Sequence, residues 1–151
     1  MLFFENGEPF ATGALTYDDG QPESAANARI MIQVQIEGQA IRAMVDTGAP
    51  WVVLDPELAE DMQIEGGAPV ESARLQIRGT TYDGSLHRIP VHLLAERGES
   101  QPVDATIFVP VLRQGEVWGN KPNFIGLLGL LDRIRYAIDP STNTFYFGPL
   151  T

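Results

Sequence analysis

The stretch Ala43-Met44-Val45-Asp46-Thr47-Gly48-Ala49 places one carboxylate at the end of an apolar segment and follows it with a hydroxyl residue and a glycine. The apolar segment predicts a strand whose end is buried in a core. An aspartate there loses hydration unless hydrogen bonds stabilise its charge or it holds a proton. A tight loop can supply backbone N–H groups and a hydroxyl, because glycine permits a sharp turn. The alternative interpretation is an ordinary turn, which Asp-Thr-Gly also forms.

Length and composition indicate one globular domain. The 151 residues are 44% hydrophobic and 20% charged, which is ordinary for a soluble domain. The 15 glycines and 11 prolines lie between short apolar runs and favour an all-β fold. We expect a single domain over residues 1–151, with an N-terminal extension or loop at 1–27 and a core at 28–149.

Charge and residue usage exclude several classes of partner and chemistry. The formal net charge is −10, so nucleic acid and anionic membranes are not expected as partners. The chain has no cysteine, which excludes disulfides, thiol catalysis and zinc–thiolate sites. The first residues lack the basic start and apolar core of a signal peptide, and no apolar run is long enough to span a membrane. We therefore expect a cytoplasmic protein.

Apolar periodicity and turn residues predict the order of the elements. Asp55 and Pro56 suit the cap and first position of a short helix. Asp83-Gly84 is a strong hairpin signal. The predicted elements are a loop at 13–27, strands at 30–36, 40–45 and 51–54, a helix at 56–62 ending before residues 66–67, strands at 72–78 and 85–94 around a turn at 79–84, a strand at 103–109, an irregular loop at 110–122, one or two helical turns at 127–134, and strands at 135–138 and 144–147.

Three stretches resemble retropepsin-like aspartic proteases, the retroviral type, over residues 30–148. The first is the Asp46-Thr47-Gly48-Ala49 loop between two apolar strands, and the second is the apolar-apolar-glycine motif Phe124-Ile125-Gly126. The third, residues 129–139, is similar to the helix-then-strand ending of bacterial and retrotransposon members. The resemblance implies an all-β fold, a closed β-barrel with one or two short helices that is active as a symmetric homodimer.

The resemblance also implies an aspartic endopeptidase that needs neither metal nor cofactor. Its chemistry uses two carboxylates that share a proton, one to activate water and one to protonate the substrate carbonyl. The chain has one Asp-Thr-Gly and no Asp-Ser-Gly. The pair can therefore form only across a twofold axis, with one Asp46 from each subunit. The expected partners are a second copy of the chain and a polypeptide substrate.

The family pattern assigns roles to further residues. Thr47 would bond to the partner's loop, and Gly48 would offer its carbonyl to the bound peptide. The hairpin from Arg74 to Leu94 is similar to the flap that closes over substrate. Apolar side chains, Val52 among them, are expected around the scissile bond. The catalytic residues expected are Asp46, Thr47 and Gly48, and the residues expected to contact substrate are Ala49, Trp51, Tyr82, Gly84 and Ile125.

Several side chains have alternative interpretations. Tyr82 either contacts substrate, stacks on the other subunit's flap, or is a surface tyrosine of a hairpin. Asp83 is interpreted as turn chemistry, and His87 and His92 as structural or exposed residues without metal-ligand spacing. The aromatic ends, Phe3-Phe4 and Phe145-Tyr146-Phe147, either form the dimer interface or pack within one subunit.

Two departures from the retroviral pattern are informative. Retroviral members carry a paired Asp and Arg where this chain has Pro50 and Leu127, so an apolar contact is expected there and the strength of the dimer is in question. Ala49 stands where pepsin-like enzymes have a hydroxyl that favours the charged carboxylate. We therefore expect a less acidic activity optimum than in pepsin-like enzymes.

Two other functions fit part of the pattern. A dimeric binding or adaptor module would keep the fold without cleaving peptides. A monomeric β-barrel would use Asp46 only as a turn residue. Molecular size separates the monomer from the other two, and the effect of Asp46→Asn on cleavage separates the enzyme from the binding module.

Overall fold

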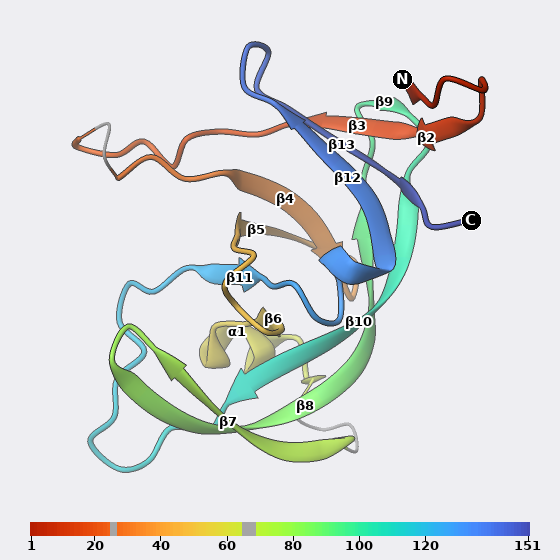
Figure 1. The fold of residues 1–151 in the computed structure, drawn as a ribbon. Coiled ribbons are helices and arrows are strands. Elements are labelled where there is room, and N and C mark those ends of the chain that lie inside the picture. The colour runs from red at the N-terminus through yellow and green to blue at the C-terminus, as the bar shows by residue number, and fades with distance from the viewer. Residues whose placement is uncertain (25–26, 65–68) are drawn as a thin grey trace.

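The computed structural model is mostly β and describes residues 1–24, 27–64 and 69–151 (Figure 1). Its helical elements include α1 (Pro56–Asp61) and the 3₁₀ turn η3 (Leu131–Arg133). The strands are β1 (Leu2–Phe3), β2 (Pro9–Ala11), β3 (Gly13–Thr16), β4 (Met31–Ile36), β5 (Gln39–Val45), β6 (Val52–Val53), β7 (Glu71–Ile77), β8 (Thr80–Leu93), β9 (Arg97–Gly98), β10 (Gln101–Pro110), β11 (Asn123–Ile125), β12 (Ile134–Asp139) and β13 (Thr144–Pro149).

The largest sheet has the strand order β10-β6-β11-β5-β4-β8-β7, and a further pairing of β10 with β8 closes all of these strands except β7 into a ring. The hairpin β4–β5 and the strands β6 and β10 lie where the sequence predicts them. Two pairings are parallel: β11 runs beside β5, and β10 runs beside β6. This arrangement brings the ends of β5 and β11 to the same place, although they are far apart in the sequence.

The second sheet has the order β12-β13-β3-β9 and corrects the prediction for residues 13–27. Residues 13–16 are not a loop. They form β3, which pairs with β13 from Phe147↔Gly13 to Thr144↔Thr16. Gly13 suits this strand because a Cβ there would lie 2.5 Å from the Phe147 ring, so only glycine lets the strands approach this closely. Residues 25–26 lie outside the described part of the chain.

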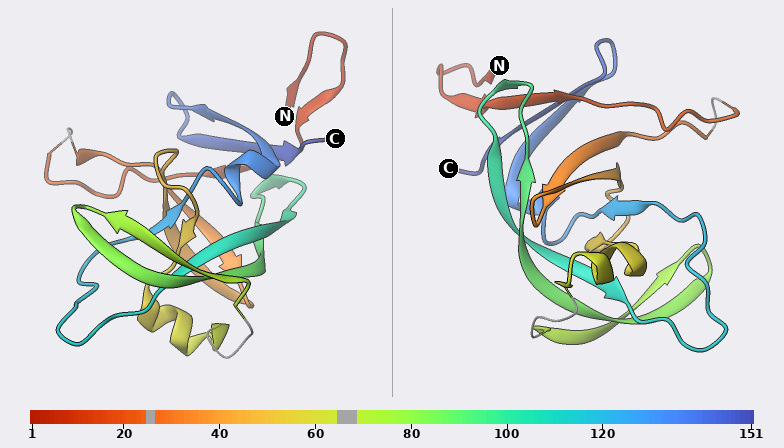
Figure 2. Two further views of the ribbon diagram at one scale, coloured as in Figure 1. Left: turned by 60° about the horizontal axis from the view of Figure 1, so that its bottom comes forward. Right: turned by 180° about the vertical axis from the view of Figure 1, so that it is seen from behind.

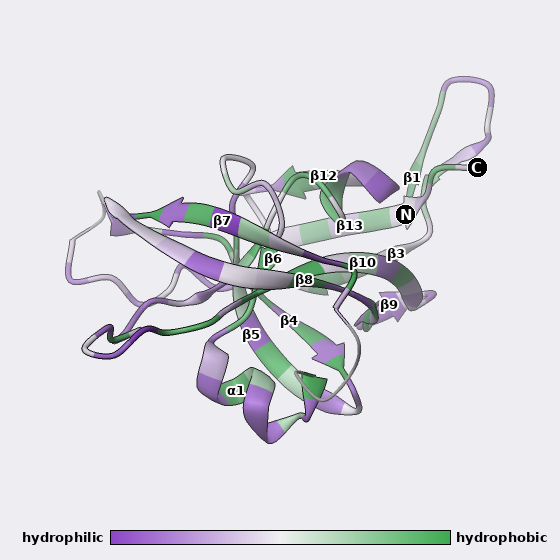
Figure 3. Cartoon of the chain, turned by 90° about the horizontal axis from the view of Figure 1, so that it is seen from below, coloured by the Kyte–Doolittle hydropathy of each residue, from purple (hydrophilic) through white to green (hydrophobic). Residues whose placement is uncertain are grey.

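The β7–β8 hairpin, which the family pattern predicts to be a flap and which is called the flap hairpin below, corrects a second prediction. The sequence predicts the turn at 79–84, but β7 and β8 are joined by Arg78 and Gly79, both with positive φ (50° and 84°). Two positive φ values define the tight turn that matches strand twist. Hydrophobic and hydrophilic residues alternate along β7 (Figure 3). From Thr80 to Leu86 the buried residues of β8 are Tyr82, Gly84 and Leu86, so the alternation continues through the predicted turn.

The short helix confirms its predicted start. The Asp55 carboxylate accepts hydrogen bonds from the N–H groups of Glu57 and Leu58, and Pro56 begins α1. Residues 66–67, before which the helix is predicted to end, lie outside the described residues. In the segment 127–134, for which one or two helical turns are predicted, the structure forms one 3₁₀ turn, η3.

The main core cluster contains side chains from both sheets. The largest fully buried side chains of the chain include Phe108, Phe145 and Phe147, so packing within one chain accounts for the last two aromatic residues. Phe3, in contrast, is 63% exposed. Both termini lie at the same end of the molecule, beside the β1–β2 hairpin (Figure 2). No helix in the described part of the chain is long and apolar enough to span a membrane.

Candidate active site

Asp46 directly follows β5 and is held by main-chain hydrogen bonds. Its N–H donates to the carbonyl of Ile125 (2.9 Å), and its carbonyl accepts from the N–H of Ala49 (3.1 Å). The carboxylate oxygen Oδ1 accepts from the N–H of Gly48 (2.9 Å). Asp46 is half-buried, whereas Thr47 and Gly48 are exposed. The loop therefore presents its carboxylate at the surface in a defined position.

The segment Ile125–Leu127 fixes this loop from behind. β11 runs parallel to β5, with Ile125 opposite Val45. A Cβ on Gly126 would lie 2.1 Å from the carbonyl oxygen of Trp51, so no other residue fits without moving the backbone. The N–H of Leu127 then donates to the carbonyl of Ala49 (2.8 Å). Pro50 and Leu127 stand where retroviral members carry a paired Asp and Arg. In this chain the hydrogen bond between Leu127 and Ala49 joins the Asp46 loop to the segment after β11.

A cavity of ≈ 290 Å³ opens beside Asp46. Gly48, Ala49 and Pro50 line it on the side of the loop, and the flap strand β7 contributes residues 75–77. The size is at the lower end of ligand pockets, so it suits one large side chain better than a whole peptide. Among the described lining residues, Asp46 is the only acid. One chain therefore supplies one carboxylate to this cavity.

Four residues expected to contact substrate lie outside the lining of this cavity. Trp51 is half-buried and stacks on Phe108, with ring centroids 5.9 Å apart. Ile125 is fully buried in the core, and its carbonyl receives the Asp46 N–H. Val53 lines the cavity, whereas Val52 belongs to the main core cluster. Substrate contact by Trp51 and Ile125 stays a prediction.

Tyr82 and Gly84, the other two, pack against neighbouring side chains of the same chain. Tyr82 is only 2% exposed, which corrects the interpretation of a surface tyrosine. Its ring packs edge-on against Trp118, and the Nζ of Lys121 lies 5.5 Å from its ring centroid. A Cβ on Gly84 would lie 2.4 Å from the Phe108 ring. Their contact with substrate also stays a prediction.

Asp83 has a different role from the one the sequence suggests. It lies within β8 and forms ion pairs with Arg74 of β7 (2.8 Å) and with Arg113 of the loop after β10. Hydrogen bonds from Arg113 first, and then from Arg74, lower the pKa of the Asp83 carboxyl. The network ties the flap to the 111–122 loop. The sequence carries no signal for it, because Arg113 is 30 residues away.

The two histidines are not arranged as metal ligands. His87 is buried, with its Nε2 2.8 Å from the Ser85 Oγ, and His92 is half-buried. Within residues 1–24, 27–64 and 69–151, no group of three or more His, Cys, Asp or Glu side chains could hold a metal ion.

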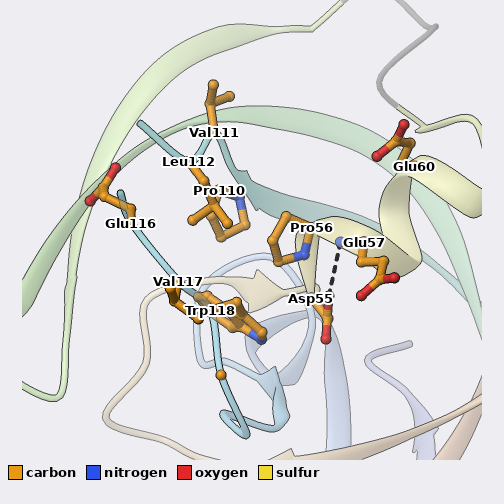
Figure 4. A pocket seen from close by; sticks show the side chains of 11 residues that line it. Asp55, Pro56, Glu57, Glu60, Pro110, Val111, Leu112, Glu116, Val117 and Trp118 are labelled. Carbon is orange, nitrogen blue, oxygen red and sulfur yellow. Dashed lines mark hydrogen bonds between the residues drawn. The ribbon is translucent and has the colours of Figure 1, made fainter. Parts of the chain in front are cut away.

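A second groove lies between α1 and the 111–119 loop (Figure 4). Its volume is ≈ 470 Å³. The exposed Val111 and Val117 line it together with the carboxylates of Glu57, Glu60 and Glu116. It shares no lining residue with the cavity beside Asp46. The groove is therefore a separate surface feature.

Comparison with solved structures agrees with the fold. A crystal structure of a retropepsin-like aspartic protease from Rickettsia conorii is similar over 90% of each chain, with a TM-score of 0.58 and 17% sequence identity. At this identity the likeness supports the fold alone. A search of curated proteins found no match.

The family comparison agrees with the motifs. The family model described as "gag-polyprotein putative aspartyl protease" matches residues 32–130, which is more than half of the chain. The matched range includes the Asp46 loop, the flap hairpin and the Ile125-Gly126 segment. The predicted resemblance to retropepsin-like proteases is thereby confirmed. The chain belongs to the gag-polyprotein aspartyl protease family.

Proposed function

We propose that this protein is an aspartic endopeptidase whose active form is a homodimer with one Asp46 from each subunit. The observation that carries the proposal is the position of Asp46. Its carboxylate lies on an exposed loop beside a cavity, and main-chain hydrogen bonds hold the loop from both sides. A structural turn residue would not require this support from a segment almost 80 residues away.

The need for a second subunit follows from the count of carboxylates. Hydrolysis by this chemistry uses two acids in contact, and among the described residues only Asp46 supplies one to the cavity. Thr47 and Gly48 are exposed beside it, so the same loop of a second chain can approach. Because a twofold axis relates identical surfaces, the two loops would meet each other.

The proposed reaction divides the work between the two carboxylates. The ionised Asp46 takes a proton from water as the water oxygen attacks the amide carbonyl. The protonated Asp46 of the partner donates its proton to the carbonyl oxygen. Collapse of the tetrahedral intermediate breaks the C–N bond and returns a proton to the leaving amine. The flap strand β7 would cover the bound peptide and exclude water.

The decisive experiment compares wild type with Asp46→Asn on a peptide library over a broad pH range. The asparagine side-chain oxygen can still accept the Gly48 N–H, so the loop should keep its shape while one acid is lost from each subunit. We expect wild type to cleave and the variant to lose at least about a thousandfold in kcat/KM. Mass spectrometry of the products gives the cleavage sites.

The control is the folded state of the variant, measured by circular dichroism and thermal unfolding. Cleavage that survives unchanged in Asp46→Asn would contradict the proposal. If both proteins bind library peptides and neither cleaves them at any pH, the protein is a binding module of the same fold.

A further inference from the structure

The cavity beside Asp46 is basic, although the chain as a whole is acidic. The sequence has 20 acidic and 10 basic residues. Apart from Asp46, the charged residues among the described lining of the cavity are Arg29 and Arg78. A local potential opposite to the net charge attracts negatively charged groups. The net charge of the residues that line this cavity is therefore positive, whereas that of the groove beside α1 is negative.

Arg78 is placed to reach a bound peptide. It is the first residue of the flap turn, is exposed, and has a φ of 50°. Among the described residues, no ion pair or side-chain hydrogen bond involves its guanidinium. By contrast, Arg74 on the same hairpin is paired with Asp83. The guanidinium of Arg78 is therefore available to an external carboxylate.

Arg29 comes from a different segment, just before β4. Its Nη1 donates to the carbonyl of Ala28 (2.9 Å), and its own N–H donates to the carbonyl of Asp19 (2.9 Å). The backbone is therefore anchored, while the guanidinium forms no ion pair within the described part of the chain. Guanidinium groups bind carboxylates through two parallel hydrogen bonds.

The interior of the same cavity is apolar. Met44, Val53 and Phe124 are buried side chains from three strands of the ring, and the flap adds Leu75 and Ile77. These residues belong to, or pack against, one hydrophobic cluster. An apolar side chain of a ligand would enter here, with the two arginines beside it.

We propose that the active site selects peptides in which an acidic residue lies within a few positions of an apolar residue at the scissile bond. Arg78 and Arg29 bind the acidic side chain, and the apolar residue fills the cavity. This inference rests on the proposed endopeptidase function and adds the charge of its substrate. Because both arginines are exposed, we expect the total preference for the acidic residue to be about threefold to fivefold, with most of it from Arg78.

The test starts from a peptide that the wild-type protein cleaves. Each position within four residues of the cleaved bond is changed in turn to Glu, Gln and Lys, and kcat/KM is measured at low and high salt. We expect the Glu peptide to exceed the Gln peptide by about threefold to fivefold at one or more positions. The preference should shrink at high salt, because ions screen exposed charges.

Two variants connect this preference to the cavity. In Arg78→Gln the Glu/Gln ratio at the sensitive position should fall toward one, and in Arg78→Glu the Lys peptide should become the better substrate. Arg88→Gln is the matched control, because it removes the same charge from an exposed site on β8 outside the cavity. It should leave the ratio unchanged.

Each outcome distinguishes the two proposals. If Glu and Gln peptides are cleaved equally well by wild type at every position, the selectivity proposal is wrong and the endopeptidase proposal stands. The same holds if neither Arg78→Gln nor Arg29→Gln changes the ratio. Binding of the same peptides to Asp46→Asn, measured by fluorescence anisotropy, tests the charge preference without cleavage, and equal binding of Glu and Gln peptides would overturn it.

Discussion

At the scale of single residues, the Asp46 loop depends on the main chain. Its position is set by the Ile125 carbonyl and the Gly48 N–H, and the missing side chain of Gly126 leaves room for Trp51 behind it. Side-chain changes around Asp46 can therefore alter its chemistry without moving it. Ala49 is the most useful position, since it lines the cavity and packs on the neighbouring hydrophobic cluster.

Replacing Ala49 with serine should move the pH–activity profile toward acid. A hydroxyl at this position can donate to the carboxylate and so favours its charged form. We expect the acid limb of kcat/KM to move to lower pH. The measurement is kcat/KM for one peptide across the pH range. Ala95→Ser, a half-buried change away from the cavity, should leave the profile in place; a profile for Ala49→Ser that is unmoved or moves toward base would contradict the prediction.

At the scale of elements, ion pairs attach the flap hairpin to the loop that follows β10. Asp83 joins Arg74 of β7 to Arg113 of the loop after β10. Three segments are thereby linked on the face of β8 opposite the buried Tyr82. The pairs lie at the surface, so salt and pH control their strength.

Replacing Asp83 with asparagine should therefore destabilise the protein at neutral pH but not in strong acid. The pKa of the Asp83 carboxyl is lowered by Arg113 and Arg74. A lowered pKa contributes stability that is fully present above the unfolded-state value, about 3.9, and is lost as the pH falls through the lower folded-state value. Denaturant unfolding of both proteins at several pH values measures this difference.

Asp104→Asn is the matched control for that experiment. Its pair with Arg88 is longer, at 3.5 Å, and both side chains are more than half exposed. The control should unfold like wild type at each pH. A destabilisation by Asp83→Asn that persists unchanged in strong acid would mean that the ion pairs are not its cause.

Elements with strong local signals were predictable, and the exceptions have physical reasons. The β4–β5 hairpin, the cap of α1 and the Asp46 loop follow from alternation, capping residues and the Asp-Thr-Gly motif. The flap turn did not follow, because Gly84 is required by the close approach of Phe108 and not by a turn. β3 was missed because Gly13 makes its short segment look like a loop, whereas β13 and β9 supply its hydrogen bonds. Such tertiary requirements leave no local pattern.

At the scale of the whole molecule, association has to overcome charge repulsion. Each chain carries a net charge of −10, so two copies repel at low salt. The exposed Phe3 and Phe4 near the chain ends offer apolar surface for association. The proposed dimer should therefore be concentration-dependent and stronger at moderate salt.

Specific activity should rise with protein concentration and then reach a plateau. The rise should match the fraction of dimer measured by sedimentation velocity, since a single chain holds one acid in its cavity. Excess Asp46→Asn protein mixed with dilute wild type should lower the activity per wild-type chain, because a mixed dimer has only one Asp46 carboxylate in its active site. Activity independent of dilution, or unaffected by the excess variant in a mixture shown to exchange subunits, would contradict the two-subunit site.

The length of β8 bears on how the predicted flap would move. The strand runs for 14 residues without interruption. Residues from Gly84 to Leu93 pair with β10, and the carbonyl of Asp83 accepts a hydrogen bond from the Val111 N–H (2.8 Å), whereas Thr80 and Thr81 pair with β7 alone. We therefore expect the end of the hairpin beyond Tyr82 to move by elastic bending spread along both strands, and not by rotation about a single hinge residue.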